Sequence, residues 1–301
     1  MATVRPFAAF RPPPGRARDV ASPPYDVIDT REARALAAGN AASFLHVSRP
    51  EIDLPEGTDE HDERVYEKGG ENLRAFVEEG VLKQDGEPHL YLYAQKWGEH
   101  RQVGVVGCAS VAEYLADTIK KHEKTRPDKE DDRTRHIEEL RAHDEPVFLT
   151  YRADREIDRM VGEAMQSSPV YDFATKDGVE HRLWVLSRAA TDELRARFET
   201  VPALYVADGH HRSAAAARVH QKLRGDGGEH DAFLAVVFPH DQMKILPYNR
   251  VVRDLKGRSA DALLAELKSR LDVEPVASGA EAAPTKPKTF GIYLGKRWYR
   301  A

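Results

Sequence analysis

The chain of 301 residues is 41% hydrophobic and 32% charged, with a formal net charge of −5, which predicts a globular protein with one large or two ordinary domains. The acidic balance does not favour nucleic acid as a partner, and the single cysteine excludes a disulfide framework or a multi-cysteine zinc site. Because no apolar run approaches the roughly 20 residues of a membrane span, and the N-terminus lacks the apolar segment of a secretory signal, we expect a cytoplasmic protein without a membrane partner.

The first half of the chain predicts alternating strands and helices around proline-rich and charged loops. In chain order the patterns indicate a strand and turn at 4–12, a proline-stiffened loop at 19–29, a helix at 30–40, a strand with an extended exit at 43–55, a helix at 62–80, and a hairpin of 89–97 with 101–111. A densely charged stretch, 117–146, follows the hairpin.

The second half continues the mixture and adds another hairpin. The patterns indicate a strand at 146–153, a helix at 154–166, a hairpin within 170–187, a helix at 190–201 capped by Thr191, a strand–turn–helix at 203–223, a strand at 232–239, a helix at 258–271, and half of a hairpin at 290–301.

Strands and helices that interleave without a βαβ period, together with hairpins, predict an α+β fold. We expect residues 1–255 to form the core, with the charged stretch as a helical arm. Residues 256–301 are expected to begin a C-terminal α+β subdomain that is incomplete, because the last hairpin half has no evident element after it. Residues 277–288 are typical of a flexible connection.

The sequence DGHHR, Asp208 to Arg212, is the most distinctive motif. It lies between an apolar strand and an alanine-rich helix, so His210, His211 and Arg212 are expected in the first helical turn. Free backbone N–H groups and the helix dipole favour an anion there, and Gly209 lets a ligand approach the backbone. The motif therefore predicts a phosphate-binding turn, with a solvated helix cap as the alternative.

A transition-metal site is the weaker interpretation of the same histidines. His210 and His211 are adjacent and diverge by about 100° on a helix, unlike a pair at i and i+4. The sequence HEKTR, which begins with His122 and Glu123, lacks the second histidine of the HExxH metalloprotease motif.

The charged stretch offers many groups that phosphoryl chemistry uses, although most charge runs are solvated surface. It contains a carboxylate base candidate, Glu123, and metal candidates Asp128 and Asp132. It also contains the phosphate-binding candidates Arg126 and Arg133. From these residues alone, a functional site and a solvated arm are equally supported.

The loop SPPYDV presents Tyr25 and Asp26 on a backbone that its prolines have already stiffened. Such a loop suits the wall of a pocket, and an ordinary structural loop is the alternative. The segment LPYNRVV (246–252) places Asn249 and Arg250 after a strand, which is a weaker signal.

Together, the segments ASPPYDVI, SFLHVSRPEIDLP, KKHEKTRPDKEDDRTRHI, PVFLTYR, ALYVADGHHRSAAAARV and ILPYNRVV resemble the bacterial and archaeal family named domain of unknown function 1015. The DGHHR turn is also similar to the phosphate-binding box of the ParB and sulfiredoxin superfamily and of the free serine kinases, which phosphorylate L-serine.

The resemblance implies a ParB/sulfiredoxin-like mixed sheet with hairpins and flanking helices, and a nucleotide site. Asp208, Gly209, His210, His211 and Arg212 would hold the phosphates of ATP or ADP, and Mg²⁺ would neutralise developing charge. Phosphoryl transfer to a small hydroxyl acceptor then needs a base. Glu123 is the first candidate, with His122 beside it, and Asp26 is the second.

Two other activities follow from the same resemblance. A ParB-like regulatory protein would bind nucleotide without transfer to a small molecule, and a homodimer is compatible with either activity. A sulfiredoxin-like repair enzyme needs a reactive cysteine, and Cys108 lies in a predicted strand away from the DGHHR turn.

Overall fold

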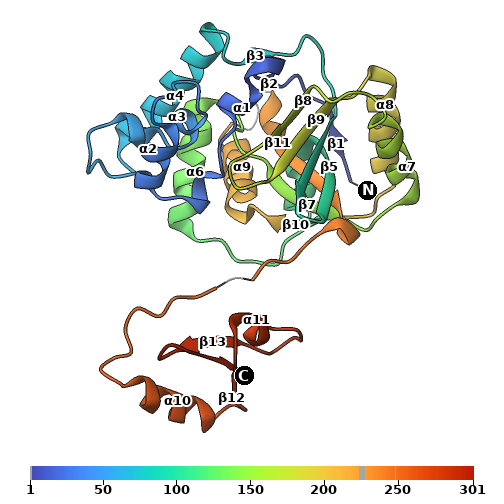
Figure 1. Ribbon diagram of the computed structural model, residues 1–301. Coiled ribbons are helices and arrows are strands. Elements are labelled where there is room, and N and C mark those ends of the chain that lie inside the picture. The colour runs from blue at the N-terminus through green and yellow to red at the C-terminus, as the bar shows by residue number, and fades with distance from the viewer. Residues whose placement is uncertain (1, 224–227, 248) are drawn as a thin grey trace. The chain divides into compact units, whose positions relative to one another are not determined.

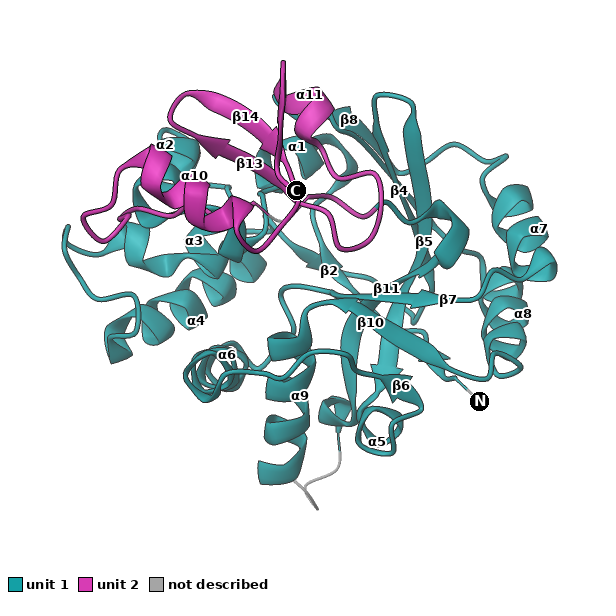
Figure 2. Ribbon diagram, turned by 90° about the horizontal axis from the view of Figure 1, so that it is seen from below, with its two compact units in different colours: residues 1–244 teal, residues 245–301 magenta. Residues whose placement is uncertain are grey.

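A computed structural model of the protein describes residues 2–223, 228–247 and 249–301. The chain divides into two compact units, residues 1–244 and 245–301, which Figure 2 distinguishes by colour. The division lies before the boundary expected at residue 255. Among the described residues, no helix is both long and apolar enough to cross a membrane.

The first unit contains eleven of the described strands. They are β1 (Val4–Arg5), β2 (Phe10–Arg11), β3 (Lys83–Gln84), β4 (Tyr91–Trp97), β5 (His100–Ser110), β6 (Ile119–Lys120), β7 (Val147–Tyr151), β8 (Tyr171–Ala174), β9 (Glu180–Val185), β10 (Leu204–Asp208) and β11 (Ala232–Pro239).

The helices of this unit include several short 3-10 turns. They are α1 (Ala17–Val20), α2 (Thr30–Ala37), α3 (Leu45–Ser48), α4 (Glu63–Glu78), α5 (Val111–Leu115), α6 (Pro127–Leu140), α7 (Arg155–Ala164), α8 (Arg188–Phe198) and α9 (His210–Lys222), with η1 (Pro14–Arg16), η2 (Tyr25–Val27), η3 (Pro50–Asp53), η4 (Glu229–Asp231) and η5 (His240–Gln242).

One large mixed sheet organises the unit. Its strand order is β6–β10–β7–β11–β5–β4–β9–β8, and β1 pairs with β5 beside this path. The pairs β6/β10 and β7/β11 are parallel and the other pairs are antiparallel. The hairpins β4–β5 and β8–β9 confirm the two predicted from sequence, and the predicted α+β class is confirmed as a mixed sheet with surrounding helices.

The core lies on the central strands and under the flanking helices. Strand β11 is buried along almost its whole length, as its continuous apolar run AFLAVVFP requires for a strand covered on both faces. Leu194 and Phe198 of α8 and Ile157 of α7 pack into the same core as Phe233 of β11. Each such side chain stabilises the fold by about 1.5–3 kcal/mol. Helices α7 and α8 lie together on one flank, and α6 and α9 on the other (Figure 1).

The prediction of a strand at residues 43–55 is wrong. These residues form α3 and η3, where Leu45, Val47 and Ile52 are buried against neighbouring helices. A short apolar run does not distinguish a strand from a buried helical turn. Here Pro50, whose ring suits the first position of a helical turn, begins η3.

The helix predicted at 190–201 exists with a different cap. Helix α8 begins at Arg188 because the Ser187 side chain accepts the N–H of Ala190. Thr191, the predicted cap, is buried inside the helix and its hydroxyl accepts the N–H of Leu90 at 3.3 Å. The cap therefore comes one turn earlier, and Thr191 ties the helix to the sheet.

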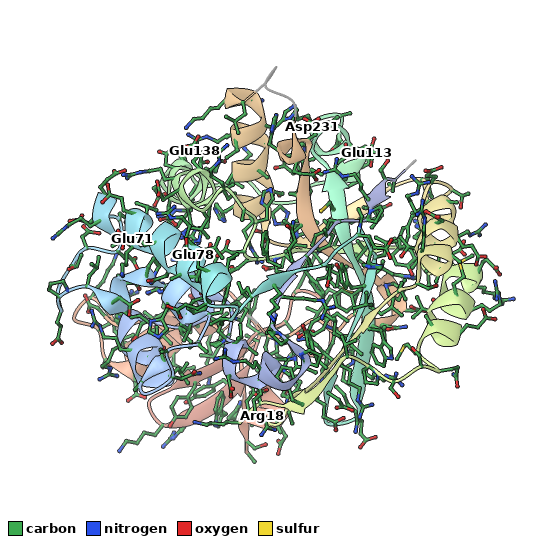
Figure 3. All side chains as sticks on the ribbon, turned by 90° about the horizontal axis from the view of Figure 1, so that it is seen from above. Arg18, Glu71, Glu78, Glu113, Glu138 and Asp231 are labelled. Carbon is green, nitrogen blue, oxygen red and sulfur yellow. The ribbon has the colours of Figure 1, made fainter. Side chains whose placement is uncertain are left out.

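The charged stretch is packed into the unit. Its strand β6 pairs with β10, and α6 packs against both α4 and α9. Ile137 and Leu140 of α6 are buried, and ion pairs also join α6 to α9. Lys222 of α9, for example, lies 2.7 Å from Glu138, which is labelled in Figure 3. The stretch is consequently part of the structural framework of the DGHHR turn.

The second unit is a small α+β element made of α10 (Ala260–Lys268), β12 (Glu274–Val276), α11 (Gly279–Ala282), β13 (Gly291–Leu294) and β14 (Arg297–Arg300). Its three strands have the order β12–β14–β13. The hairpin half expected at 290–301 forms a whole hairpin, β13–β14, and β12 pairs with β14. The flexible connection expected at 277–288 contains the helix α11.

Candidate functional site

The strand–turn–helix predicted at DGHHR is present. Strand β10 ends at Asp208, Gly209 follows with φ 91° and ψ 31°, and α9 begins at His210. Leu204 and Val206 are buried in the sheet and fix the strand beneath the turn. The left-handed conformation of Gly209 favours glycine. Because the first N–H groups of a helix have no partner within it, this end of α9 can receive an anion.

Arg212 folds back over this turn. One guanidinium nitrogen lies 2.6 Å from Asp208 Oδ2, and another donates a hydrogen bond to the carbonyl of Pro146. A Cβ atom on Gly209 would stand 3.2 Å from the guanidinium. Gly209 therefore serves both the backbone conformation and the position of Arg212.

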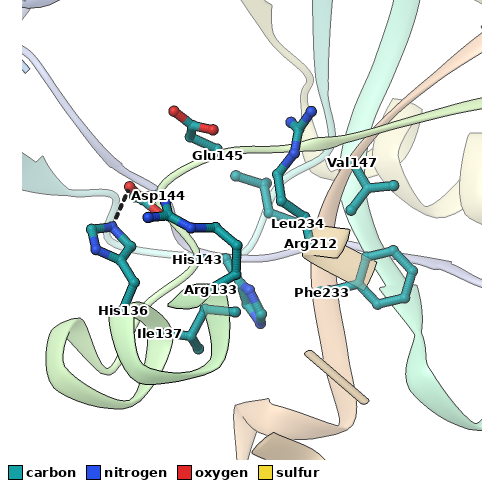
Figure 4. Close-up of a pocket in the computed structure, with 10 residues that line it drawn as sticks. All are labelled: Arg133, His136, Ile137, His143, Asp144, Glu145, Val147, Arg212, Phe233 and Leu234. Carbon is teal, nitrogen blue, oxygen red and sulfur yellow. Dashed lines mark hydrogen bonds and ion pairs between the residues drawn. The ribbon is translucent and has the colours of Figure 1, made fainter. Parts of the chain in front are cut away.

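Arg212 also lines a small cavity together with Arg133 of α6 (Figure 4). The remaining lining residues are His136, Ile137, His143, Asp144, Glu145, Val147, Phe233 and Leu234. His136 Nε2 lies 2.9 Å from Asp144 Oδ2. Arg133 and Arg212, two predicted phosphate-binding residues from separate motifs, thus line the same cavity. Glu123, the predicted base, does not line it.

Glu145 is the candidate residue that the sequence did not single out. Its Oε1 accepts the N–H of Tyr25 at 3.0 Å, whereas Oε2 is buried with no hydrogen-bond partner among the described residues. Burial, reinforced by the charge of Asp144, raises the pKa of Glu145 to about 8. The carboxyl therefore holds its proton at neutral pH. Asp132 and Asp144 of the charged stretch are also buried, but they pair with Arg133 and His136, whereas Oε2 of Glu145 has no partner among the described residues. No pattern in the sequence displays this difference.

The proline-stiffened loop brings Tyr25 to the same place. The Arg133 guanidinium stacks over the Tyr25 ring at 4.0 Å from its centroid, and Arg49 donates to the Tyr25 carbonyl at 3.3 Å. Burial raises the pKa of Tyr25 to about 12, so its hydroxyl remains neutral. Asp26, the second base candidate, is exposed on η2 next to Tyr25. The SPPYDV loop, the charged stretch and the DGHHR turn consequently meet around Arg133 and Arg212.

A second group forms on the histidine side of the turn. His210 Nδ1 lies 3.5 Å from Glu123 Oε2, and the His122 and His210 rings meet edge to face at 4.5 Å between centroids. Burial, followed by the neighbouring His122, lowers the pKa of His210 and favours the neutral imidazole. The loop between β6 and α6 thus brings Glu123 and His122, two of the three predicted catalytic residues, to the start of α9.

His211 connects the same loop to the turn from another side. Its Nε2 accepts the backbone N–H of Arg126 at 3.1 Å. The Arg126 guanidinium instead pairs with Asp128, at 2.5 Å, and both side chains are exposed. Asp128 is therefore engaged by its neighbour in the chain.

Asp132 lies elsewhere, in a buried network on α6. Its carboxylate accepts the Tyr66 hydroxyl at 2.8 Å and lies 3.1 Å from His61 Nδ1 and 2.8 Å from Arg133 Nε. Burial alone would raise the pKa of Asp132, but the guanidinium of Arg133 outweighs it and the pKa is lowered. Asp132 therefore orients Arg133, whereas Asp128 pairs with Arg126.

A family model described as Protein of unknown function (DUF1015) covers residues 4–301. No curated protein and no solved structure matches the chain. All the site residues described above lie within the matched range.

Proposed function

The chain belongs to the family described as Protein of unknown function (DUF1015), as its motifs indicated, and we propose that this member is a nucleotide-dependent phosphotransferase acting on a small hydroxyl metabolite. L-Serine is the first acceptor to test. The observation that carries the proposal is the Gly209 turn at the start of α9, with two histidines and Arg212 in the first helical turn.

The turn suits the phosphates of ATP or ADP for three physical reasons. Its free N–H groups and the positive end of the α9 dipole attract an anion. Arg212 crosses the turn on the side of Asp208, and a planar guanidinium matches phosphate oxygens. His211 adds a further donor through Nδ1, because its Nε2 accepts the N–H of Arg126. The likeness of DGHHR to the phosphate box of the ParB, sulfiredoxin and serine kinase proteins supports the same ligand.

Glu123 is the proposed base for the acceptor hydroxyl. Its carboxylate reaches the side chain of His210, the first residue of α9, whereas Asp26 lies beside Tyr25 near the cavity of Arg133. A base must be within hydrogen-bond reach of the proton it takes, so an acceptor bound at the histidine side of the turn would use Glu123. Mg²⁺ bound with the nucleotide would neutralise the charge that develops during transfer.

Incubation of the full chain with ATP or ADP, Mg²⁺ and a panel of hydroxyl metabolites that includes L-serine tests the proposal. Mass spectrometry should detect a phosphorylated acceptor, which Glu123→Gln reduces at least about 100-fold if this residue is the base. Glu87→Gln, an exposed glutamate in a loop, is the matched control. Nucleotide binding without any phosphorylated product would instead favour a ParB-like regulatory protein, and no binding at all would refute both.

A further inference from the structure

The side chains of His122, Glu123 and His210 bring three potential metal donors together. One donor atom from each lies within 4.8 Å of the other two. His122 and Glu123 are adjacent on the loop before α6, and His210 comes from the start of α9. Two segments that are far apart in the chain are therefore needed to make the group, which is why the spacing of the sequence did not reveal it.

The distances suit a metal of the zinc class with small side-chain adjustments. Neighbouring donors around a tetrahedral zinc lie about 3.3 Å apart, given metal–ligand bonds of about 2.0–2.1 Å. His210 Nδ1 and Glu123 Oε2 are already 3.5 Å apart. Because His122 and Glu123 are exposed, their side chains can close the remaining distance without moving a packed element.

His210 supplies the fixed part of the arrangement. It is 5% exposed, and its Nε2 atom has no hydrogen-bond partner among the described residues. Nδ1, on the other side of the ring, is the nitrogen that faces Glu123 and is the candidate metal donor, whereas the buried Nε2 needs a separate hydrogen-bond partner. The ring is consequently held in place while its hydrogen-bonding capacity is incompletely used.

The donor set selects the class of metal. Two imidazoles and one carboxylate are typical of zinc and other first-row transition ions, whereas Mg²⁺ prefers oxygen ligands. Three protein ligands leave the fourth coordination position of a tetrahedral ion open to water or an anion, and the exposure of His122 and Glu123 gives solvent access to it. A cation held here would lie at the first residue of α9.

We propose that His122, Glu123 and His210 bind a divalent transition-metal ion of the zinc class at the N-terminus of α9. The inference goes beyond the proposed phosphotransferase and does not depend on it, because the three side chains can bind a metal without nucleotide. Metal binding engages the Glu123 carboxylate, so a bound ion and proton acceptance by Glu123 exclude each other. Zn²⁺ should therefore inhibit the proposed Mg²⁺-dependent phosphoryl transfer.

Titration of the chelator-treated full chain with Zn²⁺, without nucleotide, tests the site by calorimetry, and Co²⁺ reports the ligand field by visible absorption. We expect one Zn²⁺ per chain at this site. His122→Ala and Glu123→Gln should each weaken its binding at least about tenfold, because even residues outside the ligand shell often cost that much. Both side chains are exposed, so these variants should keep the wild-type circular dichroism spectrum.

A second group of donors provides the matched control. His220, His230 and Asp231 also converge within 4.8 Å, and Asp231 is labelled in Figure 3. His220→Ala should leave the affinity of the proposed site unchanged. Absence of Zn²⁺ binding would overturn the proposal. Binding that survives in His122→Ala and Glu123→Gln but disappears in His220→Ala would overturn it as well, by assigning the metal to the second group.

Discussion

Replacing Glu145 by glutamine should change how stability depends on pH. Glu145 is the buried carboxyl beside Tyr25 and Arg212, and its pKa is raised from 4.5 to about 8, chiefly by burial. Glutamine keeps a neutral side chain and the oxygen that accepts the Tyr25 N–H. The substitution therefore removes the titration while preserving the hydrogen bond and the volume.

The sign of the effect follows from proton binding in the two states. Between pH 4.5 and pH 8 the folded chain holds the proton and the unfolded chain releases it. The wild-type stability contributed by this group is therefore fully present below pH 4.5 and is lost as the pH rises through about 8. Each pH unit in this window costs about 1.4 kcal/mol, so the loss between pH 4.5 and pH 7 is on the order of 3 kcal/mol.

Urea unfolding at a series of pH values measures this slope for wild type and for Glu145→Gln. We expect the variant to gain stability relative to wild type on going from pH 5 to pH 8. Glu87→Gln, at an exposed loop position, should follow the wild-type curve. Parallel curves for wild type and Glu145→Gln would show that Glu145 is ionised in the folded protein and would refute the reasoning.

Three further substitutions test the framework of the turn. Gly209→Ala places a Cβ at positive φ and 3.2 Å from the Arg212 guanidinium, so it should cost about 1–3 kcal/mol of unfolding free energy and also weaken nucleotide binding. Gly178→Ala is the matched control, because Gly178 has φ +81° with open space around it. It should lower the free energy of unfolding, measured with urea, and leave nucleotide binding unchanged. Equal losses of nucleotide binding in the two variants would contradict this account. Asp132→Asn removes the carboxylate that pairs with the buried Arg133 and should lower the free energy of unfolding by about 3–5 kcal/mol. A thermal unfolding curve identical to that of wild type would show that this ion pair does not stabilise the fold.

The DGHHR turn could be predicted because its determinants are local. An apolar strand, a glycine and an alanine-rich helix occupy one continuous segment, and the residue types of each part favour its conformation without distant contacts. The same holds for the hairpin β8–β9, where the KDG turn separates two β-rich runs, and Gly178 has positive φ.

The features that escaped prediction depend on contacts between distant segments. The run 43–55 is helical because its apolar residues pack on neighbouring helices, and a short pattern does not contain that partner. Glu145 differs from the other buried acids of the charged stretch in having a carboxyl oxygen without a partner among the described residues. His122 and His210 come together because β6 pairs with β10 in the sheet, so their spacing in sequence carries no metal signature.

The central claim is that the start of α9 binds the phosphates of a nucleotide, and calorimetric titration with ATP and ADP in the presence of Mg²⁺ tests it most directly. Wild type should bind, and Arg212→Ala should bind at least about tenfold more weakly, because a charge-assisted hydrogen bond contributes about 1.5–3 kcal/mol. Arg218→Ala, farther along α9 and paired with Asp131, should match wild type. Equal affinities for all three proteins, or no binding by wild type, would contradict a phosphate site at DGHHR.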